Sequence, residues 1–187
     1  MTSRRAQPRV RRVPTDRMTG PELDAIRGLM DEAFGSGEEA FGDDDWAHAL
    51  GGLHVVLDVG GRIAAHAAVV ERELRVGGRS LRTGYVEAVA TAPDLQGTGL
   101  GTAVMGPVAI HIRDRYELGA LGTGSHTFYE RLGWRTWRGP SSVRLPDGRE
   151  RPTPDEDGFI MVLLTRTTAD LDLALPISCD WRPGDVW

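Results

Sequence analysis

The stretch that decides the fold is Gln96-Gly97-Thr98-Gly99-Leu100-Gly101, which follows a strand-like segment at 79–91 and opens a helical pattern at 99–116. The first turn of a helix offers backbone N–H groups that have no acceptor within the helix, and the helix dipole places positive charge there. Glycines at this point let a phosphate approach the main chain. We therefore expect an anion-binding loop; a glycine-rich turn that only redirects the chain is the alternative.

Two common nucleotide-binding patterns do not fit this stretch. The Rossmann spacing requires a third glycine where this chain has Thr102 or Val104. The Walker loop requires a lysine, and all 22 basic residues of the chain are arginines. The same absence excludes mechanisms that use a Schiff-base lysine or the lysine of protein kinases. The pattern that remains is Q-x-x-G-x-G.

The composition predicts one globular domain with a cationic partner. The 187 residues are 40% hydrophobic and 26% charged, and no apolar run is long enough to span a membrane. The N-terminus lacks the apolar segment of a secretory signal, and the single cysteine excludes an internal disulfide, so we expect a cytoplasmic protein without membrane contact. The net charge of −5 disfavours nucleic acid as a partner.

Acidic residues are concentrated in one segment. Residues 22–45 hold nine acids against Arg27 alone, whereas residues 4–17 hold six arginines and one aspartate. The acidic segment indicates cation binding, and an exposed helix face is the alternative explanation.

The order of the elements predicts an α/β (α+β) fold. Apolar residues at helical spacing indicate a helix at 20–34, and a short second helix ends at Gly51-Gly52. The helix at 99–116 contains Pro107, which should kink it, and crosses between neighbouring strands. The tail 168–187 is expected to be a loop. The remaining predicted elements are an antiparallel meander of strands at 53–59, 62–76 and 79–91, further strands at 118–123, 134–138 and 158–164, and a helix at 126–133.

These features resemble the GCN5-related N-acetyltransferases (GNATs), in which Q-x-x-G-x-G opens a helix and a tyrosine helix follows, here Phe128-Tyr129-Glu130-Arg131-Leu132-Gly133-Trp134. DDDWAHALGGLHVVL, RIAAHAAVVERELRVGGRSLRTGYVEAVA, YERLGW, TPDEDG and the final CDWRPGDVW are similar to the aminoglycoside 2'-N-acetyltransferases of that superfamily. The resemblance implies a GNAT fold, with a central mixed, mostly antiparallel sheet flanked by helices. The single domain 1–187 would carry a basic arm at 1–17 and a tail at 166–187 that completes the substrate site.

The resemblance also implies the reaction. Acetyl-CoA would be the donor and the 2'-amino group of an aminoglycoside antibiotic the acceptor, with direct transfer in a ternary complex of a homodimeric resistance enzyme. Glu87 matches the general base that acts through water, and Tyr129 matches the general acid that protonates the departing CoA thiolate. Without the family, Glu87 could be an exposed strand acid and Tyr129 a core aromatic. The residues implied to bind CoA, the first three by main-chain pairing with the pantetheine arm, are Val89, Ala90, Thr91, Gln96, Gly97, Thr98, Gly99, Leu100 and Gly101.

Acceptor recognition is assigned to carboxylates from separate segments, since an aminoglycoside carries several ammonium groups. Family likeness ranks Glu156, Asp155 and Asp185 first among the acids, which also include Asp157 and Asp180. The implied acceptor-binding residues are Asp45, Glu87, Ala88, Gly122, Asp155, Glu156, Asp185 and Trp187, the last through its terminal carboxylate. The chain departs from the family at Ala40, where an acid can stand, and at Gly122, where a serine can stand; the substitutes considered are Glu39, Asp43 and Thr123.

Other residue types carry less chemistry. The five histidines show no spacing typical of metal ligands, so we expect no metal, and His66 is interpreted as an ordinary strand histidine. Cys179 is interpreted as a packed thiol. Two other functions remain open: a GNAT that acetylates a cell-wall amino sugar, a polyamine or a protein N-terminus, and a non-catalytic sensor of acetyl-CoA or of cations.

Overall fold

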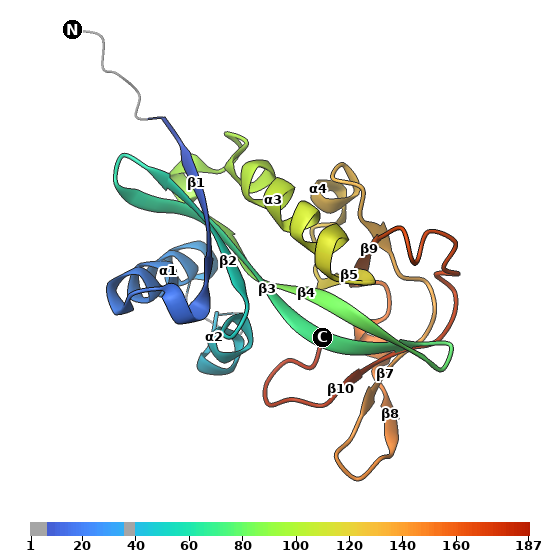
Figure 1. Ribbon diagram of the computed structural model, residues 1–187. Helices are drawn as coiled ribbons and strands as arrows, with labels where there is room; N and C mark the ends of the chain where they lie inside the picture. The colour runs from blue at the N-terminus through green and yellow to red at the C-terminus, as the bar shows by residue number, and fades with distance from the viewer. Residues whose placement is uncertain (1–6, 36–39) are drawn as a thin grey trace, which may run out of the picture. The chain divides into compact units, whose positions relative to one another are not determined.

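A ten-stranded mixed sheet and four α-helices make up the described part of the computed structural model, residues 7–35 and 40–187 (Figure 1). The chain divides into two compact units, Met1–Val70 with Glu87–Val108 and Glu71–Val86 with Ala109–Trp187. Strands β3 (Arg62–Val76) and β4 (Arg79–Thr91) and helix α3 (Leu100–Arg115) contribute residues to both units. The predicted α/β class is confirmed.

The first unit is built on the hairpin of β2 (Leu53–Val59) and β3, which has the predicted bounds. Gly60 and Gly61 join the strands with φ values of 61° and 83°, the conformation that a tight hairpin turn requires. Strand β1 (Arg9–Pro14) pairs antiparallel with β2, where the sequence indicated only a basic arm. Arg11 secures this strand through ion pairs of 2.9 Å with both Asp58 and Glu22.

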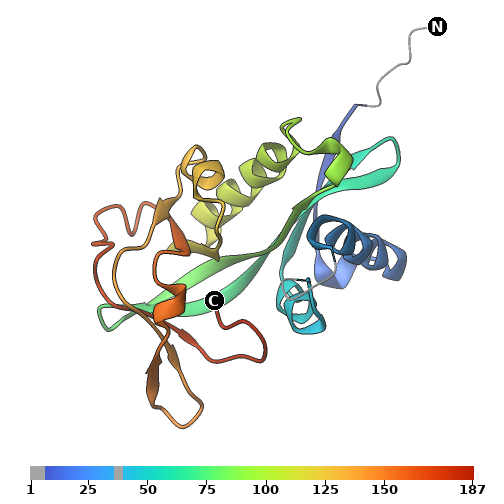
Figure 2. The ribbon, with the colours of Figure 1, turned by 180° about the vertical axis from the view of Figure 1, so that it is seen from behind.

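Two helices complete the core of the first unit. Helix α1 (Gly20–Phe34) has its predicted bounds and begins with a capping box between Thr19 and Glu22. Helix α2 (Asp43–Ala49) follows the residues that the structure does not describe. Figures 1 and 2 show both helices on the same side of β2 and β3. The side chains buried together there are Ile26, Leu29, Met30, Ala49, Val56, Ala68, Ala88, Ala90 and Ala92.

The second unit contains strands in the order β6-β9-β5-β4-β3-β10-β7-β8. β4 and β5 pair in parallel, which confirms that the helix between them crosses between neighbouring strands. A Cβ on Gly84 would lie 2.7 Å from the Tyr116 ring, so glycine permits the close approach of the end of α3. The other elements are β5 (Leu118–Gly122), α4 (His126–Glu130), β6 (Arg135–Thr136), β7 (Ser141–Arg144), β8 (Glu150–Pro152), the 3-10 turn η3 (Pro154–Glu156), β9 (Ile160–Leu164) and β10 (Ile177–Asp180).

Three expectations about the C-terminal half are wrong in part. The tail is not entirely loop, because β10 pairs antiparallel with β3 and parallel with β7. The helix expected at 126–133 ends at Glu130, after which tight turns lead to Gly133 at a φ of 87°. The strand expected at 134–138 is reduced to Arg135–Thr136, because both Trp134 and Trp137 are fully buried rather than alternating between faces. None of the helices among the described residues is long and apolar enough to cross a membrane.

Candidate active site

The anion-binding loop lies in the first unit, between the 3-10 turn η2 (Pro93–Leu95) and α3. Gly97 and Gly99 have φ values of 74° and 91°, a left-handed conformation that glycine adopts without strain. A Cβ on either glycine would meet no atom within 4 Å, so open space lies beside the main chain. The Thr98 hydroxyl donates to the Leu95 carbonyl at 2.5 Å and fixes the turn. With the free amides of the first helical turn, the loop has the geometry of a phosphate site.

Strand β4 offers a main-chain edge next to this loop in the sequence. Its parallel ladder with β5 covers Thr83–Tyr85, and the described residues of β4 beyond Tyr85 do not pair with β5. In the predicted pantetheine segment, Val89 and Thr91 are half-buried and Ala90 is buried. An extended ligand with amide groups can add to such an edge as a further strand.

The burial pattern of β4 differs between its two halves. Leu81 and Thr83 are buried on the odd-numbered face, residues 83 to 86 are all buried, and Ala88 and Ala90 continue the burial on the even-numbered face. Ala88 has a φ of 50° and is alone among the described non-glycine residues in having a positive φ. Glu87, the predicted base, directly precedes this turn and is half-buried. Glu87 therefore lies next to the irregular point of the strand.

Tyr129, the predicted acid, belongs to α4 in the second unit and is 7% exposed. Its ring packs edge-on against Phe128 and Trp134, with centroids 4.9 and 6.0 Å away. Burial raises the pKa of the Tyr129 phenol to about 12, because the phenolate would lose its hydration. The hydroxyl thus keeps its proton throughout the physiological range.

The three acids ranked first come together in the second unit. Asp155 and Glu156 lie on η3, and the charges of Asp185 and Asp155 act on Glu156. Burial, followed by these two charges, raises the pKa of Glu156. An ammonium ion placed among the three would relieve their mutual repulsion, and the cluster therefore favours a cationic ligand.

The last residues of the chain are held against the same unit. Trp187 is buried, and its Nε1 donates to the Thr153 hydroxyl at 3.0 Å, three residues before Glu156. A Cβ on Gly122 would lie 3.6 Å from the main-chain oxygen of Trp187. Trp187 thus lies beside Gly122 and bonds to Thr153, the residue directly before the acidic turn η3.

Sequence reasoning missed the arginines that hold this tail. Arg72 on β3 donates to the carbonyls of Val186 at 2.8 Å and Asp180 at 3.2 Å. Arg72 and Arg182 both lie over the ring of Tyr85, at 4.6 and 5.5 Å from its centroid. Nothing in the local pattern VERELRV distinguishes Arg72 from a surface arginine, so only the tertiary contact reveals its role.

Several other predicted acids already have structural partners. Asp45 accepts the backbone N–H of Gly42 at 2.8 Å and caps α2, and Asp43 lies 2.7 Å from Arg27. Asp157 accepts both the N–H and the hydroxyl of Ser141. Asp180 lies 2.9 Å from Arg144. Glu39, a proposed substitute for the acid missing at Ala40, falls outside the described residues.

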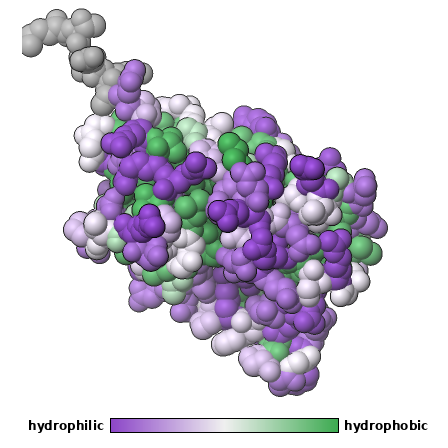
Figure 3. All heavy atoms as spheres, in the orientation of Figure 1, coloured by the Kyte–Doolittle hydropathy of each residue, from purple (hydrophilic) through white to green (hydrophobic). Residues whose placement is uncertain are grey.

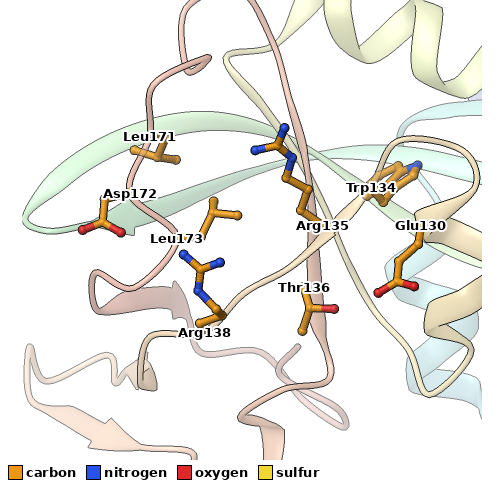
Figure 4. Close-up of a pocket in the computed structure, with 8 residues that line it drawn as sticks. All are labelled: Glu130, Trp134, Arg135, Thr136, Arg138, Leu171, Asp172 and Leu173. Carbon is orange, nitrogen blue, oxygen red and sulfur yellow. The ribbon is translucent and has the colours of Figure 1, made fainter.

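Cys179, the possible metal ligands and the pocket add no further residue to the predicted site. Cys179 is buried, and burial raises the pKa of its thiol, as a packed cysteine requires. Within residues 7–35 and 40–187 no group of three or more His, Cys, Asp and Glu could hold a metal. A pocket of about 470 Å³ in the second unit contains none of the predicted site residues (Figure 4). Its lining residues are Glu130, Trp134, Arg135, Thr136, Arg138, Leu171, Asp172 and Leu173.

Known proteins share both the sequence and the fold. The sequence-family model of the acetyltransferase (GNAT) domain matches residues 15–137 of this chain. An aminoglycoside 2'-N-acetyltransferase of Mycolicibacterium fortuitum is 42% identical over 180 residues, which are 95% of this chain and 91% of that protein.

Two solved structures show the same fold at low identity. The GNAT family N-acetyltransferase YhbS of Escherichia coli, in complex with CoA, is 17% identical with a TM-score of 0.63 over 94% of this chain and 89% of its own. A GNAT family acetyltransferase of Brucella melitensis, in complex with acetyl-CoA, is 20% identical with a TM-score of 0.56 over 71% of this chain and 85% of its own. The chain belongs to the GNAT acetyltransferases and, within them, to the aminoglycoside 2'-N-acetyltransferase family.

Proposed function

We propose that this acetyltransferase moves the acetyl group of acetyl-CoA to the 2'-amino group of aminoglycoside antibiotics. The observation that carries the proposal is the 42% identity to the Mycolicibacterium fortuitum enzyme over 95% of the chain. The open loop at 96–101 supports the binding of a CoA pyrophosphate, and the β4 edge supports the binding of its pantetheine arm.

The acidic turn supports a cationic acceptor. Glu156, Asp155 and Asp185 are close enough for their charges to raise the pKa of Glu156, and an aminoglycoside brings several ammonium groups to such a cluster. The Trp187 backbone beside Gly122 would form part of the same surface. Asp45 and Ala88 are also proposed to contact the aminoglycoside, as the family resemblance implies.

The proposed reaction needs one base and one acid. The 2'-nitrogen forms a bond with the thioester carbonyl carbon, the carbon–sulfur bond breaks, and CoA leaves with the electron pair on sulfur. Glu87 takes the ammonium proton through a water molecule, since the nitrogen needs a free lone pair to attack. Tyr129, which is protonated at neutral pH because burial raises its pKa, donates its proton to the departing sulfur, and the second proton that the nitrogen loses as the amide forms restores the phenol through water.

The family resemblance supports further proposals about resistance, location, oligomeric state and partners. Acetylation removes a positive charge from the drug, so the enzyme would confer resistance in the cytoplasm. It would act as a homodimer, without nucleic-acid or membrane partners. On the face shown in Figure 3, hydrophobic residues are scattered among hydrophilic ones, so this face shows no continuous hydrophobic patch that could form the dimer interface. The mass measured by size-exclusion chromatography with light scattering tests whether the protein is a dimer.

A panel of acceptors tests the substrate. CoA release should be measured with aminoglycosides that carry a 2'-amino group, matched compounds that carry a 2'-hydroxyl, linear polyamines and an amino sugar of the cell wall. We expect release only with the 2'-amino compounds. CoA release with polyamines or the amino sugar alone would show that the acceptor is not an aminoglycoside. No CoA release with any amine would favour a non-catalytic sensor.

A further inference from the structure

Two buried histidines connect the N-terminal part of the first unit to the irregular point of β4. The Thr15 hydroxyl lies 2.8 Å from Nε2 of His54, and Nδ1 of His54 lies 2.9 Å from Nε2 of His66. Nδ1 of His66 lies 2.7 Å from the carbonyl oxygen of Ala88. Both imidazoles are fully buried. The four groups form one continuous chain of hydrogen bonds.

The carbonyl at the end of this chain determines the tautomer of both neutral rings. A carbonyl oxygen only accepts, so Nδ1 of His66 carries a proton and Nε2 of the same neutral ring is an acceptor. His54 must therefore donate from Nδ1 to His66, which leaves its Nε2 unprotonated beside the Thr15 hydroxyl, whose other acceptor is the Gly52 carbonyl at 3.2 Å. Burial lowers the pKa of His54 to about 4 and that of His66 to about 3, consistent with neutral rings.

The Ala88 carbonyl belongs to a residue in an unusual backbone conformation. An alanine at a φ of 50° occupies the left-handed region that side chains with a Cβ disfavour, and it persists only when its surroundings hold it. Buried peptide oxygens also need a donor. His66 supplies that donor from β3.

We propose that His54 and His66 are positioning residues for acetyl transfer, because they hold the left-handed turn at Ala88. This turn orients the carboxylate of Glu87 and determines that the main-chain edge for the pantetheine arm begins at Val89. This inference rests on the proposed function, because it assigns the pair a role in the acetyl-transfer site. His66 acts on the turn directly, and His54 keeps His66 in the tautomer that can donate to it. Neither histidine touches a reacting atom.

Two substitutions at one position separate positioning from packing. His66→Leu fills the space but removes the donor, whereas His66→Asn carries an amide N–H near the place of Nδ1 and can still donate to Ala88. We expect His66→Leu to lower kcat by about 10-fold to 10²-fold, since small displacements of catalytic groups have effects of that size. The KM for acetyl-CoA should change less. His66→Asn should regain most of the loss.

A second-site change and a control sharpen the test. Adding Ala88→Gly to His66→Leu should recover part of the kcat, because glycine adopts the turn without support. His111→Asn, at a half-buried imidazole on α3, controls for the loss of a histidine. Thermal unfolding and CoA titration show that each variant is folded. Wild-type kcat in folded His66→Leu, or equal losses in the Leu and Asn variants without recovery by Ala88→Gly, would overturn the proposal.

The wild-type protein gives an independent readout that needs no variant to fold. Nitrogen NMR of the imidazoles should show both buried rings protonated at Nδ1, with and without acetyl-CoA. His126 is an internal contrast, because its Nε2 lies 2.7 Å from the carbonyl of Gly158 and must carry the proton. Protonation of His54 or His66 at Nε2 would overturn the inference. Failure of the wild type to acetylate any 2'-amino compound would instead refute the proposed function.

Discussion

Acidification from pH 7 to pH 5.5 should destabilise this protein through the buried histidine pair. Burial lowers the pKa of His54 to about 4 and that of His66 to about 3, whereas both rings titrate near 6.5 in the unfolded chain. The unfolded state therefore binds more protons in this range. Stability contributed by the neutral rings is present above the unfolded pKa and is lost as the pH falls towards the folded values.

The size of the effect follows from these pKa values. One pH unit corresponds to about 1.4 kcal/mol for each proton bound only by the unfolded chain, so each ring contributes about 1.2 kcal/mol between pH 7 and pH 5.5. The pair should lower the free energy of unfolding by about 2.5 kcal/mol. This is a large part of the stability of an ordinary domain.

Urea denaturation measured at steps between pH 7 and pH 5.5 tests this expectation. Replacing His54 with phenylalanine should remove about half of the pH dependence, even where it lowers the stability at pH 7. His126→Asn is the matched control for the loss of a histidine, at a half-buried position outside the buried pair. A free energy of unfolding that stays constant over this range, or an equal slope in His54→Phe, would show that the two rings are not held neutral by burial.

Three further predictions concern the proposed site. Gly99→Val should raise the Kd for CoA about tenfold or more and leave the Kd for an aminoglycoside nearly unchanged. The valine side chain would fill the open space beside the loop, and valine cannot adopt the φ of Gly99 without strain. Calorimetry that shows equal losses of affinity for both ligands would argue against a phosphate site. Tyr129→Phe should lower kcat by about 10²-fold with CoA binding retained, and an unchanged kcat would remove the phenol from the mechanism. Glu156→Gln should weaken aminoglycoside binding yet raise the melting temperature at pH 7.5. The raised pKa means that this carboxylate stabilises the fold only when protonated, so its contribution is lost as the pH rises. A lower melting temperature with unchanged affinity would contradict both parts.

Local patterns predicted the elements whose signals lie within one segment. The Thr19-to-Glu22 capping box determines where α1 begins, and the Gly60-Gly61 turn determines where the β2–β3 hairpin reverses. The helix predicted at about 20–34 and the strands predicted at 53–59 and 62–76 agree with the structure. The glycine loop before α3 was also found from the sequence. Such features depend on backbone conformation and on neighbours a few residues away.

Features that depend on distant neighbours were missed. β10 is short and becomes a strand only because β3 and β7 lie on either side of it. His66 was correctly placed in a strand, but its contact with His54 across the hairpin and with Ala88 on β4 has no local signal. The positive φ of Ala88 was invisible, because alanine gives no sign of a turn. Long-range pairing created each of these, including the support proposed for Glu87.

The position of the acetyl group on the product tests the proposed function most directly. The purified enzyme should be incubated with acetyl-CoA and an aminoglycoside that carries amino groups at the 2', 3 and 6' positions, and the product mapped by NMR. We expect a single acetyl group on the 2'-nitrogen and no product from the matched 2'-hydroxyl compound. Acetylation at the 3 or 6' nitrogen, or equal turnover of the 2'-hydroxyl compound, would contradict it.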